Sequence, residues 1–150
     1  MELDVIQNKI FEIRGFKVML DFDLALLYNV ENKRLKASVR RNLNRFPEDF
    51  MFELTEMEFT NLRTKFSSSS YGGLRYMPFA FTEQGIAMLS GILNSEVAIN
   101  VNIAIMRTFV IIRRFAIEHK ELNSKLLEME SKYEKQFSDI YEALNFIIKR

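Results

Sequence analysis

The chain has 150 residues, of which 48% are hydrophobic and 27% charged, and a net charge of +1. This fits one globular domain with room for an appended segment. The absence of Cys excludes disulfides and thiolate metal sites, and the single His119 is too few for zinc. The N-terminal residues lack the apolar run of a secretory signal, and Asn and Arg interrupt the apolar stretch 97–117. We therefore expect a cytoplasmic protein without a membrane span.

The first predicted element is a β-hairpin over residues 9–20. Its apolar side chains alternate on either side of an Arg-Gly pair at 14–15, which suits a tight turn. A short helix ending at Tyr28 follows. We expect Asp21 or Asp23 to cap its N-terminus, since both can accept a hydrogen bond from a free backbone N–H.

A second helix is predicted over residues 32–45, after a turn at Asn29, which tolerates the left-handed conformation. Pro47 is expected to end it. Apolar residues at helical spacing form its predicted core face: Leu35, Val39, Leu43 and Phe46. At about 100° per residue, mostly basic side chains occupy the opposite face: Lys33, Arg34, Ala37, Arg40, Arg41 and Asn44.

The charge of this second helix stands out from the near-neutral chain. Residues 31–46 contain six basic side chains and one acid, a local charge of six minus one, or +5. From residue 118 onward there are six basic and seven acidic residues, or −1. A concentrated basic patch is typical of a polyanion-binding surface, although a solvated helix face remains the alternative.

The middle of the chain alternates strands and helices. Residues 50–54 are predicted as a strand, and the Thr55–Glu58 capping box opens a helix to about Phe66. A Ser/Gly-rich loop is predicted over residues 67–73.

A further strand is predicted over residues 77–81, where we expect Pro78 to mark a sheet edge, since proline donates no ladder hydrogen bond. Thr82 is predicted to cap a helix that continues to residue 93.

The C-terminal third is predicted to be one long helix, with Ser95 as its N-cap. No Gly or Pro follows Gly91, and the helical signal persists from Glu96 nearly to the end. Its first part is apolar on most sides, which favours a buried central helix. A polar segment, 118–124, separates this part from the tail. Apolar residues from Leu122 onward follow an imperfect heptad spacing that predicts dimerisation: Leu122, Leu126, Met129, Tyr133, Ile140 and Ile147, with Gln136 and Ala143 as weak steps and Phe137 and Leu144 shifted sideways.

The two helices around Asn29 meet the physical demands of a helix-turn-helix, whose second helix enters the DNA major groove. A small residue, Ala25, stands where the helices touch. Apolar anchors flank the turn: Leu24, Tyr28, Val30 and Leu35. Arg commonly contacts guanine and Asn adenine, while a small residue such as Ala37 lets the helix approach closely.

Several blocks of the chain also resemble a known family: IRGFKVMLDFDLALLYNVENKRLKASVRRNLNRFPEDFMFELTEMEF, and then GGLRYMPFAFTEQGIAMLSGILNSEVAINVNIAIMRTFV. They are similar to the phage and bacterial KilA-N-like domains, and more narrowly to the branch called the ORF-six N-terminal domain. The resemblance covers most of the chain before the tail. It implies a small α+β DNA-binding domain, common in phages, prophages and their hosts and often joined to variable C-terminal modules.

We therefore predict an α+β fold. A helix-turn-helix-containing domain with a short β-hairpin or sheet spans residues 1–117, and a helical oligomerisation tail, a candidate coiled coil, spans 118–150. The predicted function is a sequence-specific DNA-binding regulator of phage or prophage type, homodimeric through the tail, with double-stranded DNA as partner. The predicted DNA-binding residues are Lys33, Arg34, Lys36, Ala37, Arg40, Arg41 and Asn44. No catalysis, metal, cofactor or small-molecule substrate is expected, since nucleophile-elbow, phosphate-loop and metal-ligand patterns are absent from the sequence.

Two interpretations remain open for several other features of the sequence. Antirepressor-like proteins contain related domains, so the chain could instead bind a repressor, through the tail or the apolar surface near Phe79. Asn100 and Asn102 are expected to hydrogen-bond in the core rather than contact a ligand. The remaining basic side chains could reach DNA phosphates, with the Ser/Gly loop as a wing, or serve surface roles and carboxylate pairs: Arg63, Lys65, Arg75, Arg107, Arg113 and Arg114.

Overall fold

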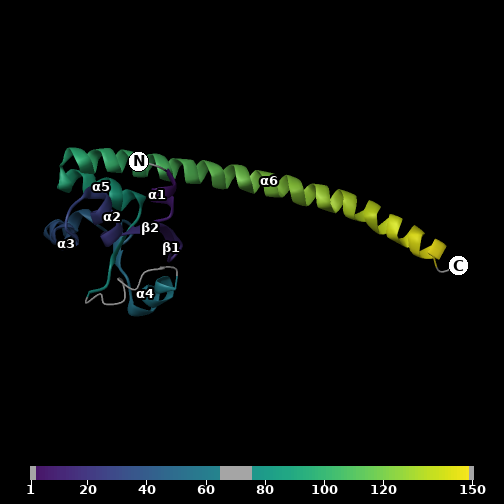
Figure 1. Ribbon diagram of the computed structural model, residues 1–150, viewed down its shortest axis with the longest axis horizontal. Helices are drawn as coiled ribbons and strands as arrows, with labels where there is room; N and C mark the ends of the chain where they lie inside the picture. Colours follow the sequence, from purple (N-terminus) through teal and green to yellow (C-terminus); the bar gives the residue numbers. More distant parts are fainter. Residues whose placement is uncertain (1–2, 65–75, 149–150) are drawn as a thin grey trace. The chain divides into compact units, whose positions relative to one another are not determined.

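The computed structural model describes residues 3–64 and 76–148 and has the predicted α+β fold, a four-stranded antiparallel sheet with helices and then a long C-terminal helix (Figure 1). The elements in chain order are α1 (Leu3–Gln7), β1 (Ile10–Ile13), β2 (Phe16–Leu20), α2 (Asp21–Tyr28), α3 (Asn32–Arg41), η1 (Leu43–Arg45), β3 (Met51–Glu53), α4 (Glu56–Arg63), β4 (Phe79–Phe81), α5 (Glu83–Leu93) and α6 (Glu96–Ile148). The predicted Ser/Gly loop, the expected helix end at Phe66, and the candidates Lys65 and Arg75 lie outside the described residues.

The predicted N-terminal hairpin is confirmed. Strand β1 pairs antiparallel with β2, from Ile10 opposite Met19 to Ile13 opposite Phe16. Arg14 and Gly15 both have positive φ, 55° and 79°. Positive φ at both central residues is the type I′ geometry, which matches the right-handed twist of the paired strands.

The strand order β1-β2-β4-β3 places β4 inside the sheet, so the edge position expected from Pro78 is wrong. β4 pairs with β2 through Met19 opposite Phe81 and with β3 through Met51 opposite Phe81. Pro78 precedes the strand, where its missing N–H costs no ladder bond, and its carbonyl accepts a hydrogen bond from the Leu54 N–H at 3.0 Å.

Alternation along the strands divides the buried side chains between the two faces of the sheet. One face packs against α2, α3, α5 and α6, and its core includes Met19, Leu24, Leu35, Val39, Phe79, Phe81, Ile86 and Ile105. The other face packs against α4, and its core includes Val18, Leu20, Phe52, Phe59, Leu62 and Ala80. Because β4 contributes Phe79 and Phe81 to one face and Ala80 to the other, it serves both cores.

Three predicted helix caps are confirmed. Thr55 and Glu58 form a complete capping box at α4. The Thr82 hydroxyl oxygen accepts from the Gly85 N–H at 3.4 Å, and Ser95 accepts from the Ala98 N–H at 3.1 Å.

The N-terminus of helix α5 packs closely against the backbone of residues 49–50, just before β3. The Thr82 N–H donates to the Phe50 carbonyl at 3.0 Å, and the Thr82 hydroxyl donates to the Asp49 carbonyl at 2.8 Å. A Cβ at Gly85 would lie 2.0 Å from the Phe50 carbonyl oxygen, so only glycine fits this position.

The first part of α6 buries one face rather than most of its surface, which corrects the expected central helix. Residues at helical spacing enter the core: Ala98, Val101, Ile105 and Phe109. On other sides Val97, Ile103 and Ile111 are 50%, 44% and 45% exposed.

The chain divides into two compact units, Met1–Phe109 and Val110–Arg150. The domain boundary predicted after residue 117 falls inside the second unit and stays a prediction. Within the described ranges, no helix combines the length and apolar character that crossing a membrane requires.

The close approach at Gly85 generates a stability prediction. Gly85→Ala should lower the free energy of unfolding by about 3 kcal/mol, because the new Cβ must displace the Phe50 backbone. Gly91→Ala in the same helix is the control. Its Cβ would meet only the end of the Arg45 side chain, at 3.4 Å, so higher helix propensity should raise stability by up to about 1 kcal/mol. Urea unfolding followed by circular dichroism measures both, and equal effects would contradict the packing argument.

Candidate nucleic-acid interface

Helices α2 and α3 are joined by the tight turn that the sequence predicts. Asn29 adopts the left-handed conformation, with φ 59° and ψ 45°. The Val30 N–H donates to the Ala25 carbonyl at 3.0 Å, and the Asn29 N–H donates to Leu26 at 3.2 Å. These two bonds form a Schellman motif, which ends α2 and redirects the chain into α3.

Two buried hydrogen bonds in series connect α2 to α6 and α5. The Tyr28 hydroxyl donates to the Asn102 side-chain oxygen, and the Asn102 amide donates to the Ile86 carbonyl at 3.0 Å. The core role predicted for Asn102 is confirmed, whereas Asn100 is exposed and the same prediction for it is wrong. These hydrogen bonds hold α2 against α5 and α6, because a buried polar group that lost its partner would destabilise the folded state.

Helix α3 is amphipathic, with Leu35 and Val39 fully buried. Lys33, Arg34 and Arg40 are exposed on its outer side. Ala37 is half-buried among them. We call Lys33, Arg34, Ala37, Arg40 and Arg41 the α3 basic face.

The predicted helix end at residue 45 is wrong, since α3 stops at Arg41. The Asn42 side-chain amide donates to the Ser38 carbonyl at 2.8 Å, taking the acceptor that the next helical N–H would use. The chain then enters the 3₁₀ turn η1, where Asn44 is exposed off the α3 helix and Leu43 is 56% exposed. Of the two apolar residues expected beyond Arg41, only Phe46 reaches the core.

Lys36 does not lie with the other basic residues. It is 8% exposed, and its ammonium lies 3.2 Å from the Asp21 carboxylate and donates to the Met77 carbonyl at 2.8 Å. It also lies 4.8 Å from the centre of the Phe79 ring. These contacts point the Lys36 side chain into the fold, so the α3 basic face excludes it.

Asp21 does not cap α2 as expected. The N-cap is Leu20, which makes no side-chain cap bond. The fully buried Asp21 carboxylate accepts from the Phe22 N–H at 2.7 Å and from the Phe79 N–H at 3.1 Å. Burial raises the pKa of Asp21, and Lys36 with the two backbone donors opposes that rise. Asp21 therefore ties α2 and α3 to strand β4.

Asp23, the other expected cap, lies 3.5 Å from the Lys9 ammonium, and burial raises its pKa too. Its role is therefore a partly buried ion pair near the hairpin, not a helix cap.

The Phe79 ring adds little to the apolar surface expected around it, because that ring is 6% exposed. Lys36 covers it together with Arg40, whose guanidinium carbon lies 5.4 Å from the ring centre. This cation–π contact restrains Arg40 while leaving it exposed.

Other basic residues extend the exposed surface. Arg41 donates to the Ser38 hydroxyl at 3.3 Å. Arg45 is exposed on η1 and its guanidinium lies beside Gly91 of α5. Arg45 belongs to the basic run of residues 31–46 but is not among the predicted site residues, and this run is the sequence signal that marks it. Arg63 and Arg107 are also exposed, on α4 and α6.

Comparison with known proteins gives one family. The ORF6N domain model matches residues 8–92, a range that contains the sheet, α2, α3 and most of α5. No curated protein and no solved structure matches the chain.

The buried position of Lys36 generates a prediction that separates it from the α3 basic face. Lys36→Met should lower the free energy of unfolding by about 3 kcal/mol, since it leaves the Asp21 carboxylate buried without a cation. Adding Asp21→Asn should recover part of this loss, because the neutral amide oxygen can still accept from the Phe79 N–H. Lys33→Met on the exposed side of α3 should change stability by less than about 0.5 kcal/mol. A urea-unfolding double-mutant cycle measures these values, and strictly additive effects would contradict the coupling.

Proposed function

The chain belongs to the ORF6N domain family, and on this premise we propose that it binds double-stranded DNA through the α3 basic face, as a transcriptional regulator of phage or prophage type. The proposal includes two finer points: α2 and α3 act as a helix-turn-helix, and the family relationship extends to the KilA-N-like domains. The role is one of binding in the cytoplasm and requires no catalysis, metal ion or cofactor.

The arrangement of charge around Ala37 carries this proposal. At about 100° per residue, Lys33 and Arg40 flank Ala37 on one side, and Arg34 and Arg41 flank it on the other. The small Ala37 side chain permits close approach to a groove, while the four cations match the phosphates that border it.

The core beneath α3 supports the same reading. Leu35 and Val39 are fully buried, and the Lys36–Asp21 pair fixes a third point of the helix against the sheet. A rigid support of this kind lets side chains reach a partner at a constant angle and with little loss of conformational freedom. We assign phosphate contacts or base reading to the four cations. Asn44, which lies on η1, is assigned a supporting contact with the DNA.

We further propose that the protein is a homodimer through the tail of α6. In that tail the apolar stripe predicted from the sequence is exposed, with Leu126 at 49% and Met129 at 52%. A two-fold dimer would carry two α3 helices and would favour DNA with two symmetric half-sites.

A second candidate function is antirepressor-like binding to a repressor protein. Two exposed apolar side chains one helical turn apart on α6, Ile99 and Ile103, favour it, since exposed apolar surface is typical of protein interfaces. This function predicts capture of a purified repressor without any shift of DNA in a gel.

The DNA-binding proposal predicts the behaviour of a charge-removal variant. Arg40→Ala combined with Arg41→Ala should weaken binding to a labelled mixed-sequence DNA duplex. It should also reduce the slope of log affinity against log salt by about two, close to one unit for each lost phosphate contact. Fluorescence anisotropy across a salt series measures both quantities.

A matched control removes two exposed charges from the tail, Lys120→Ala combined with Lys135→Ala. It lowers the net charge by the same amount as the Arg40 and Arg41 variant does. Its slope of log affinity against log salt should equal that of the parent chain within error. Circular dichroism checks that each variant is folded. If the Arg40 and Arg41 variant binds with unchanged affinity and slope, α3 is not the DNA-binding element.

A further inference from the structure

The tail of α6 carries one continuous apolar stripe, and the described part of its own unit contains no other element for the stripe to pack against. The second unit, Val110–Arg150, is helical throughout its described part. The stripe begins with four residues at heptad spacing, Leu122, Leu126, Met129 and Tyr133, which are 53%, 49%, 52% and 41% exposed. Apolar exposure of this extent along one helix face marks an interface.

The stripe continues to the end of the helix through a change of phase. After Tyr133 the next apolar residue is four positions on, at Phe137, followed by Ile140, Leu144 and Ile147. These four are 60%, 54%, 47% and 67% exposed. An extra four-residue step is a stutter, which brings the mean spacing to about 3.6 residues, the repeat of a straight α-helix. The stripe therefore runs through Phe137 and Leu144, and the weaker heptad steps at Gln136 and Ala143 lie beside it.

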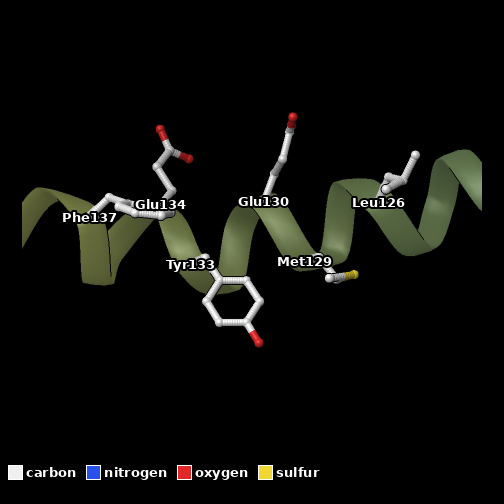
Figure 2. A pocket seen from close by; sticks show the side chains of 6 residues that line it. All are labelled: Leu126, Met129, Glu130, Tyr133, Glu134 and Phe137. Carbon is white, nitrogen blue, oxygen red and sulfur yellow. The ribbon is translucent and has the colours of Figure 1, made fainter.

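Opposite charges border the stripe on its two sides. Figure 2 shows Glu130 and Glu134 projecting on one side of the helix, away from Met129 and Tyr133. At about 100° per residue, Lys125 and Lys132 fall on the other border. Between residues 125 and 134 one border thus carries two acidic side chains and the other carries two basic ones.

We propose that a second copy of this chain covers the stripe, parallel to the first and in register with it. In a parallel pair the acidic border of each helix faces the basic border of the other, which places Lys125 opposite Glu130 of the second copy. In an antiparallel pair each border faces its own kind, so Lys125 and Lys132 lie against the basic border of the other helix. Charge complementarity therefore selects the parallel arrangement. This inference rests on the proposed homodimer and adds its orientation, register and contact residues.

The natural absence of Cys lets single cysteines report the arrangement. Met129→Cys in the full chain should form a disulfide-linked dimer rapidly under mild oxidation, since the two thiols meet across a parallel in-register pair. Ser131→Cys, two positions away on the outer side, should cross-link at least about tenfold more slowly, because its thiols point apart. A mixture of Met129→Cys and Ile140→Cys should give no excess of mixed dimer.

The opposite pattern overturns the inference. Slow cross-linking of Met129→Cys together with rapid linkage between positions 129 and 140 would show an antiparallel pair. Light scattering of the unmodified chain separates this failure from failure of the proposed dimer. A mass of two chains with the wrong cross-link rejects only the orientation, whereas a monomer rejects the dimer itself, and DNA binding is measured independently of both.

A second measurement tests the path of the stripe. Phe137→Ala should raise the dimer dissociation constant by at least about tenfold, since it removes a large apolar contact at the interface. Gln136→Ala, one residue away, should change it by less than about threefold. The reverse order would place the interface along the uninterrupted heptad and would contradict the stutter.

Discussion

The arrangement of the candidate DNA-binding surface depends on one buried carboxylate. Asp21 is inaccessible to solvent, and its oxygens accept from the Phe79 backbone and contact the Lys36 ammonium. A buried charge without such partners would be strongly unfavourable, so the fold must keep α2, α3 and β4 in contact at this point. The orientation of α3 relative to the sheet is therefore fixed by an ion pair as well as by apolar packing.

This constraint divides the basic residues of α3 into two groups with different structural roles. Lys36 points inward and stabilises the fold, whereas Lys33, Arg34 and Arg40 remain exposed. Arg40 lies between these roles, because it stacks near Phe79 and still faces solvent. A helix with this division presents its exposed cations at defined positions, and the proposed contact with DNA phosphates depends on this.

Helix α6 carries apolar residues at helical spacing in both of its parts, and their exposure differs between the two. Before residue 110 the apolar residues on one face of α6, such as Ile105 and Phe109, are buried in the core of the first unit. Beyond residue 110 apolar residues recur at helical spacing but are exposed, as at Leu126 and Ile140. The periodicity is similar in both parts, and the burial differs because the first unit supplies packing elements that the described part of the second unit does not.

The sequence by itself determined the features that depend on neighbouring residues: the turns at Arg14 and Asn29, the caps at Thr82 and Ser95, and the amphipathic faces of α3. These follow from backbone preferences and hydrogen bonds that span only a few positions. The tertiary structure decided the inward turn of Lys36, the central place of β4 and the choice of Asn102 over Asn100. Each of these depends on partners distant in sequence, such as the 41 positions between Lys36 and Met77 and the 74 between Tyr28 and Asn102. Spacing along a chain shows which residues share a face, but only folding brings such distant partners into contact.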